Sequence, residues 1–95
     1  MTYQEKFQAI KSVYEESFDM DFYADSLTDL IQEIRADKAS NQTIIERILL
    51  DWAGEVGCAD DGEICEKSLN KLHQGGFLTE KELKLFWENT HFRQG

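Results

Sequence analysis

Residues 40–58, SNQTIIERILLDWAGEVGC, contain the widest apolar helical face in the sequence. The apolar positions that recur there with the helical period are Ile44, Ile45, Ile48, Leu49, Trp52, Ala53 and Val56. Leu50 widens this face further. Because no other segment offers as much apolar surface, we expect this helix to be the central element against which the others pack.

The ends of this helix are marked by capping signals. Thr43 and Glu46 have the spacing of a capping box, with Ser40 or Asn41 as the alternative N-cap. Gly54 and Gly57 lie near the end of the helix, and Gly57 is the better candidate for the left-handed position that ends it.

Two helices are predicted before this segment. The first begins after Thr2, which has capping-box spacing with Glu5. A turn at residues 18–22 separates it from the second helix, which starts at Phe22 or Ser26 and ends at Lys38. The inner apolar positions are Tyr3, Phe7, Ile10, Tyr14 and Phe18 in the first helix and Tyr23, Leu27, Leu30, Ile31 and Ile34 in the second.

Two further helices are predicted after it. An acidic turn at residues 59–63 leads into a shorter helix, with Asp60 or Asp61 as its N-cap and the Gly75-Gly76 pair as its stop. The last helix begins after Thr79, which again has capping-box spacing. Its inward-facing residues are Leu83, Phe86 and Trp87.

The length and composition fit one small domain. The 95 residues include no proline, and every apolar pattern has the helical period. The sequence therefore predicts an all-α fold, a compact single-domain bundle over residues 1–95 of about five helices with short loops. Neither a signal peptide nor a membrane-spanning run is present, so we expect a cytoplasmic protein. In that compartment Cys58 and Cys65 are expected to be free thiols; a disulfide would require their Cα atoms to lie within about 7 Å.

The charge is strongly negative and unevenly distributed. Nineteen acidic and ten basic residues give a net charge of −9, which disfavours direct binding to nucleic acid or an anionic membrane and favours a basic partner. Residues 15–37 carry a local charge of −7 and residues 51–66 carry −6, so the remainder of the chain is positive.

Five carboxylates in the second predicted helix are spaced by four residues, which places them on the side opposite its apolar face. We call them the acidic ridge: Asp21, Asp25, Asp29, Glu33 and Asp37. Like charges at this spacing destabilise a helix by about 0.2–0.5 kcal/mol per pair, so folding does not require the ridge. It is either a docking surface for a cationic protein or an ordinary solvated face.

Three aromatic residues lie within the first acidic window and Tyr14 directly precedes it, and aromatic residues set among charges are typical interface anchors. We expect at least one of Tyr14, Phe18, Phe22 and Tyr23 to be exposed. The candidate partner-binding residues are Asp21, Asp25, Asp29, Glu33, Phe22, Tyr23, Asp60, Asp61 and Glu63.

No pattern indicates metal binding or catalysis. Cys58, Cys65, His73 and His91 fit none of the usual zinc spacings, and no calcium loop, phosphate-binding glycine loop or nucleophile elbow is present. Most carboxylates lie on polar faces, where a raised pKa is not expected. The sequence therefore predicts no metal, no cofactor and no enzymatic activity.

Two stretches, DMDFYADSLTDLIQEI (residues 19–34) and LLDWAGEVGCADDGEICE (residues 49–66), carry a resemblance. In size, helix content and charge, the chain resembles the small all-helical bacterial immunity proteins of the type associated with colicin D and with contact-dependent inhibition. It lacks the Tyr-Tyr element of the four-helix colicin immunity family. The resemblance implies binding and blocking of a basic toxin domain, with acidic residues in the positions that substrate phosphates would approach.

The leading hypothesis is therefore an inhibitor of a basic protein, most simply an immunity protein that occludes the nucleic-acid-binding or active-site surface of a nuclease toxin. A second hypothesis is a phage-type inhibitor that mimics nucleic acid and targets a defence or regulatory complex. A third is a structural or adaptor module that forms a homodimer. Monomer and dimer remain open.

Overall fold

The structure, a computed structural model, describes residues 2–37 and 42–90. These residues form the helices α1 (Tyr3–Ser17), α2 (Met20–Ala36), α3 (Gln42–Gly54), α4 (Ala59–Gln74) and α5 (Glu80–Glu88), and the described part contains no strand. The all-α prediction is thus confirmed. No helix in the described part is long and apolar enough to span a membrane.

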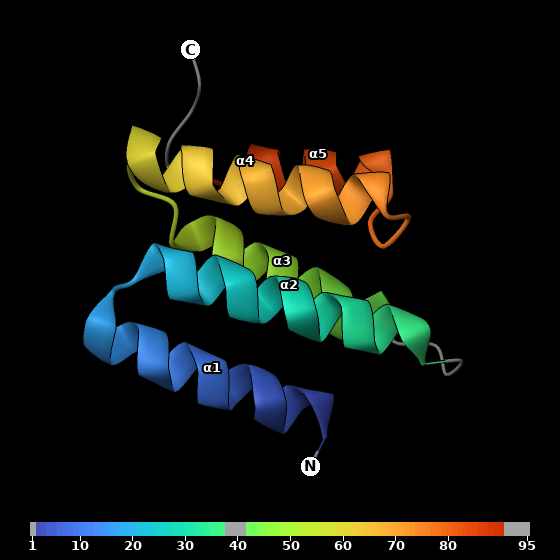
Figure 1. Cartoon of the computed structure of the whole chain (residues 1–95), viewed down its shortest axis with the longest axis horizontal. Coiled ribbons are helices and arrows are strands. Elements are labelled where there is room, and N and C mark those ends of the chain that lie inside the picture. The colour runs from blue at the N-terminus through green and yellow to red at the C-terminus, as the bar shows by residue number, and fades with distance from the viewer. Residues whose placement is uncertain (1, 38–41, 91–95) are drawn as a thin grey trace.

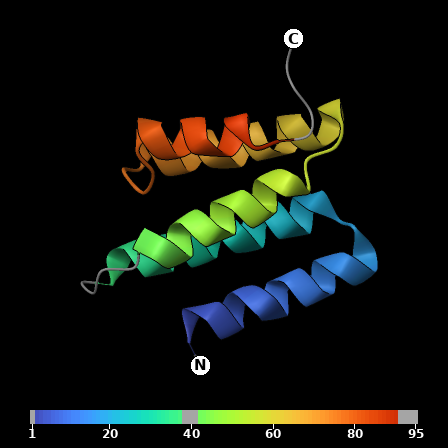
Figure 2. The same ribbon diagram turned by 180° about the vertical axis from the view of Figure 1, so that it is seen from behind.

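The helices form two layers. In one layer α1, α2 and α4 lie side by side, and α3 and α5 form the other (Figure 1). From behind, α3 lies across α2 and α5 lies against α4 (Figure 2). The molecule measures 37 × 30 × 18 Å, and its shortest dimension fits two layers of helices with axes about 8–10 Å apart.

The core draws on all five helices, but α2 contributes most to it. Eight residues of α2 are buried, compared with five of α3. The reason is position, because α2 is flanked by α1 and α4 and covered from behind by α3. The expectation that residues 40–58 form the central element is therefore corrected in favour of α2. Leu50 does not widen the buried face of α3, since 42% of it is exposed.

The connection between α1 and α2 is tighter than the sequence predicts. The capping box of Thr2 and Glu5 is confirmed, with both of its hydrogen bonds present. However, α2 begins at Met20, because the Asp19 carboxylate accepts a hydrogen bond from the Phe22 backbone N–H at 3.2 Å and caps the helix. Only Phe18 and Asp19 separate α1 from α2, so the prediction of a turn over residues 18–22 is wrong.

The start of α3 also differs from its prediction. Thr43 lies inside the helix, so it is not the N-cap, and Ser40 and Asn41 lie outside the described residues, as does Lys38 at the predicted end of the preceding helix. The helix ends at Gly54, before Gly57. Val56 is nevertheless fully buried beyond its end.

Residues 59–63 are the first part of α4 and not a turn. Cys58 occupies the N-cap position without a side-chain hydrogen bond, so neither Asp60 nor Asp61 is the cap. Both aspartates lie in the first turn, where a negative charge interacts favourably with the helix dipole and stabilises the start of the helix. With 16 residues, α4 is longer than α3, which has 13.

The start of α5 was predicted correctly. Thr79 and Glu82 exchange both hydrogen bonds of a capping box, Phe86 is buried, and Leu83 and Trp87 pack against the core.

The sequence did not reveal a second role of Glu82. Its carboxylate also forms an ion pair with Arg35 and accepts a hydrogen bond from Gln42 at 3.0 Å, which connects α5 to α2 and α3.

One buried hydroxyl leads to a prediction about stability. The Tyr23 hydroxyl is fully buried and has no hydrogen-bond partner in the described part of the chain. An unsatisfied buried polar group is destabilising, so Tyr23→Phe should raise the free energy of unfolding by about 1 kcal/mol. Urea denaturation tests this. Tyr3→Phe is the control, because the Tyr3 hydroxyl donates a hydrogen bond to Asp37 Oδ2 at 2.7 Å, and its loss should lower stability. A clear loss of stability in Tyr23→Phe would contradict the prediction.

Candidate protein-interaction surface

Four helix ends lie at one end of the molecule. The C-terminal ends of α1 and α3 and the N-terminal ends of α2 and α4 are on the left in Figure 1, with α2 and α3 between α1 and α4. Asp51, in the last turn of α3, pairs with Lys11 of α1 at 3.5 Å. The other acidic residues of these ends, which we call the acidic end, are Glu15, Glu16, Asp19, Asp21, Glu55, Asp60, Asp61 and Glu63. Residues 12–34 and 48–66 contain no lysine or arginine. The acidic end thus gathers carboxylates from both acidic windows of the sequence.

These carboxylates are accessible and carry uncompensated charge. Glu55 and Asp61 are half-buried, and the other members of the acidic end are exposed. Within the described residues, none of the eight forms a salt bridge. Clustered charges of one sign raise the local concentration of oppositely charged ligands and accelerate their association. The acidic end is therefore an attractive surface for a cationic group.

Folding explains some of these acids and not others. Asp19, Asp60 and Asp61 lie at helix N-termini, where negative charge is stabilising. Glu15 and Glu16 lie in the last turn of α1, which contains no basic residue. A negative charge at the C-terminal end of a helix interacts unfavourably with the helix dipole and lowers helix stability by about 0.3–1 kcal/mol. The two glutamates therefore stand where the stability of α1 disfavours them.

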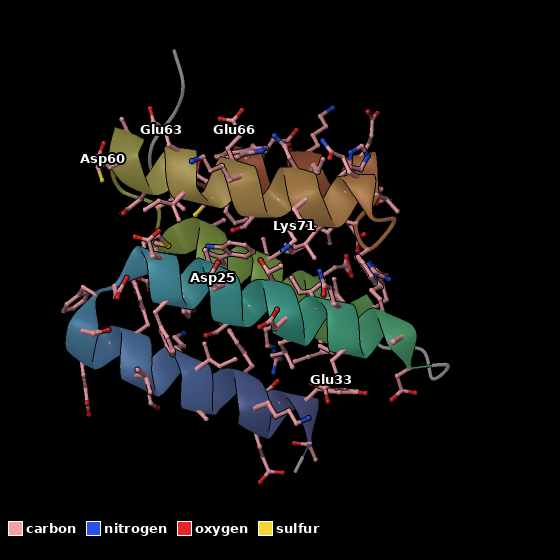
Figure 3. The ribbon with its side chains drawn as sticks, viewed as in Figure 1. Asp25, Glu33, Asp60, Glu63, Glu66 and Lys71 are labelled. Atoms are coloured by element: carbon pink, nitrogen blue, oxygen red, sulfur yellow. The ribbon has the colours of Figure 1, made fainter. Side chains whose placement is uncertain are left out.

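The acidic ridge does not form one surface. All five of its residues are exposed, but Glu33 forms an ion pair with Lys6 of α1, and Asp37 accepts a hydrogen bond from Tyr3. In Figure 3, Asp25 lies on the side of α2 that faces α4, whereas Glu33 lies on the side that faces α1. Residues four apart advance by about 40° around a helix, so the row turns across α2. The structure thus separates Glu33 from the acidic end.

The second acidic window points in another direction. Glu63 and Glu66 lie along the outer edge of α4, away from α2, whereas Asp60 lies at the N-terminal end of α4 and Lys71 on the side that faces α2 (Figure 3). Asp29 is exposed on α2 outside the acidic end. Of the predicted partner-binding acids, Asp21, Asp60, Asp61 and Glu63 lie at the same end of the molecule, but Glu63 faces away from α2, and Asp25 and Asp29 continue along α2.

Two of these four aromatic residues, at and directly before the first acidic window, are exposed, which confirms the expectation of at least one. Phe18 is 70% exposed and Phe22 is 37% exposed. Tyr14 and Tyr23 are buried and stack on each other, with ring centroids 4.2 Å apart. Tyr23, at 0% exposure, is removed from the candidate partner-binding residues because the inward face of α2 carries it into the core.

Sequence reasoning missed the gathering of these helix ends, although a signal existed. When short loops connect antiparallel helices, the end of each odd helix lies beside the start of the next even helix. The same alternation places the α1–α2 and α3–α4 connections at one end of the bundle. Sequence reasoning also left Phe18 out of the candidate partner-binding residues, because it was assigned to the inner stripe of the first helix.

Phe18 has an unusual backbone conformation. Its φ of 52° and ψ of 29° lie in the left-handed region, and its N–H donates to the Tyr14 carbonyl oxygen at 2.7 Å. Glycine is the usual residue at such a helix end, because a side chain there is strained. The Phe18 ring makes an edge contact with Tyr14, at 5.8 Å between centroids. A large apolar residue thus occupies a strained and exposed position.

Phe18→Gly should therefore leave the free energy of unfolding unchanged or raise it by up to about 1 kcal/mol. Glycine relieves about 1–2 kcal/mol of left-handed strain, which offsets the loss of about 0.5–1 kcal/mol from the aromatic contact. Val13→Gly is the matched control. Val13 is an exposed apolar residue inside α1, where glycine should lower stability by about 0.5–1 kcal/mol. If Phe18→Gly lowered stability by more than 1 kcal/mol in urea denaturation, Phe18 would be a structural residue.

The cleft between α3 and α5 is a weaker candidate site. An open cleft of about 570 Å³ lies between α3 and α5, lined by Gln42, Glu46, Thr79, Lys81, Glu82, Lys84, Leu85 and Glu88. Glutamates and lysines alternate there, so it favours no single charge.

The thiols and imidazoles of the described residues also form no metal site. Both cysteines are free, and burial raises the pKa of the Cys65 thiol to about 12, whereas Cys58 is exposed. His91 lies outside the described residues, and within them no three His, Cys, Asp or Glu side chains are grouped as a metal would require.

No protein-family model, curated protein or solved structure matches the chain.

Proposed function

We propose that the chain binds a basic protein through the acidic end and thereby inhibits it. The observation that carries this proposal is the location of four helix ends at one end of the molecule, where the carboxylates of the acidic end form no salt bridge within the described residues and Phe18 is exposed. Complementary charge would steer the partner to this end, and the apolar ring would add contact area once the two proteins meet.

A nuclease toxin is the partner that best suits this surface. A nuclease must present a cationic surface to bind the phosphate backbone, and clustered carboxylates can occupy that surface in place of phosphates. The resemblance to helical immunity proteins supports the same partner. Such an immunity protein would act in the cytoplasm, where the toxin meets its nucleic acid.

The experiment is affinity capture followed by an activity assay. The tagged protein would be incubated at low salt with lysate containing the products of the neighbouring genes, and bound proteins would be released by stepwise increases in salt. One stoichiometric basic protein, released by moderate salt and inhibited as a nuclease by the purified chain, is the expected result. A captured nucleic-acid-binding complex without nuclease activity would favour the mimic of nucleic acid instead.

A contrary result would be equally informative. If no basic partner is captured and sedimentation shows a self-associated species that persists at high salt, apolar contacts and not charge govern association. The chain would then be a structural or adaptor module, and the acidic end would be solvated surface.

A further inference from the structure

We propose that Phe18 receives an arginine side chain of the partner, which stacks on its ring while the neighbouring carboxylates bind the guanidinium. This inference rests on the proposed function and specifies the chemistry of the contact. It makes Phe18 a residue that determines specificity, since it would distinguish arginine from lysine.

The geometry leaves the Phe18 ring available. Its only ring contact within the described residues is the edge contact with Tyr14, whose planes meet at 74°, and 70% of the residue is exposed. Tyr14 is itself fixed by stacking on the fully buried Tyr23, with an interplanar angle of 18°. The exposed ring is therefore supported by two buried rings, and a stacking partner would meet a positioned surface.

Four exposed carboxylates lie within three residues of Phe18 in the sequence. Glu15 and Glu16 precede Phe18, Asp19 follows it directly, and Asp21 comes two residues later; all four are exposed. Asp19 caps α2 through one carboxylate oxygen, which leaves its other oxygen available as an acceptor. The acids of this end also act on buried Tyr14, whose pKa is raised first by burial and further by the charges of Glu55 and Asp61.

Arginine fits this combination better than lysine does. A guanidinium is planar, can stack on an aromatic face and can donate two parallel hydrogen bonds to a carboxylate at the same time. The lysine ammonium is a compact and strongly hydrated charge that gains less from an exposed ring. An aromatic face beside several free carboxylates therefore favours arginine.

A second copy of this chain is the wrong occupant for this surface. Pairing two acidic ends would place carboxylates opposite carboxylates, which is repulsive. Val13, Phe18 and Phe22 are the large exposed apolar side chains near this end among the described residues, and so few side chains do not make an apolar dimer interface. Charge complementarity thus selects a cationic protein.

The test compares nona-arginine and nona-lysine peptides as probes. Their dissociation constants for the full chain would be measured at low salt by fluorescence anisotropy, together with those of Phe18→Leu, which keeps an apolar side chain but loses the aromatic face. We expect Phe18→Leu to weaken nona-arginine binding about three- to fivefold and to change nona-lysine binding by less than about twofold. Phe18→Gly should give the same pattern, which excludes a misfolded variant as the cause.

Leu50→Ala is the matched control, because Leu50 is exposed and apolar but lies on α3 outside the acidic end. It should leave both dissociation constants unchanged. In NMR spectra of the complex, stacking should shift the arginine δ-methylene resonance upfield, and Phe18→Leu should abolish that shift.

The possible failures are distinguishable. If Phe18→Leu leaves nona-arginine binding unchanged while Glu15→Lys/Glu16→Lys weakens both peptides, the surface acts by charge alone; this inference is then wrong and the proposed function stands. If the unmodified chain binds neither peptide at low salt, the acidic end does not attract cations, and both proposals are overturned.

Discussion

Glu82→Ala is expected to lower the free energy of unfolding by about 2–3 kcal/mol, because it leaves the half-buried Arg35 guanidinium without its carboxylate and removes the Glu82 half of the α5 capping box. Glu82 is 5% exposed and its carboxylate interacts with Thr79, Gln42 and Arg35. One side chain therefore links the start of α5 to α2 and to the start of α3.

Urea denaturation measures this effect, and Glu80→Ala is its control. Glu80 is an exposed glutamate in the same first turn, but it does not take part in the network of Glu82. A change of less than about 0.5 kcal/mol is expected there. Equal and small effects of the two substitutions would show that the network does not stabilise the fold.

The same network predicts a dependence of stability on pH. Burial alone would raise the pKa of Glu82, but hydrogen bonds from Thr79 and Gln42 and the charge of Arg35 outweigh it, so the pKa is lowered from 4.5. The unfolded state then binds the proton more readily than the folded state. The contribution of Glu82 is complete above the unfolded pKa and is lost as the pH falls through the folded pKa. The difference in stability between the unmodified chain and Glu82→Gln should accordingly shrink as the pH is lowered below about 4.5.

Glu15→Lys/Glu16→Lys is expected to weaken binding of the basic partner by about tenfold or more at low salt, because it replaces attraction by repulsion at the acidic end. The same change places lysines at the C-terminus of α1, where they complement the helix dipole. Stability should therefore be equal or higher, and loss of binding cannot be ascribed to unfolding. Isothermal titration calorimetry of the purified pair measures the affinity.

The control for this prediction is Glu46→Lys/Glu88→Lys. It changes the net charge by the same amount, at exposed positions beside the cleft between α3 and α5. Binding should weaken much less, and only through the long-range field. If both double variants weakened binding equally, net charge and not the acidic end would govern association. If only the control weakened it, the partner would bind at the cleft.

Local signals predicted the parts of the fold that depend on neighbouring residues. The capping boxes of α1 and α5 are complete within four residues each, so the sequence located both helix starts correctly. The start of α2 was misplaced because Phe18, an apolar residue, occupies a left-handed position where glycine is usual, so the turn was expected to be longer. The end of α3 and the start of α4 were predicted wrongly, because Gly54 and Gly57 were competing candidates for the helix end and two aspartates were competing candidates for the next N-cap.

Packing decided what the sequence could not. The apolar period of residues 40–58 identified a buried helix, but only the arrangement in two layers shows that α2 is more enclosed. The four-residue spacing of the acidic ridge was real, yet whether Glu33 is free depends on Lys6 of another helix. The burial of Tyr23 likewise follows from the direction in which α2 faces the core, which determined that Phe18 and not Tyr23 is available at the acidic end.

Hydrogen–deuterium exchange of the chain with and without its captured partner tests the central claim most directly. Binding at the acidic end should slow exchange in residues 14–25 and 55–63, and leave α5 and the first half of α3 unchanged. Protection confined to the cleft between α3 and α5, with the acidic end exchanging as in the free protein, would contradict the account.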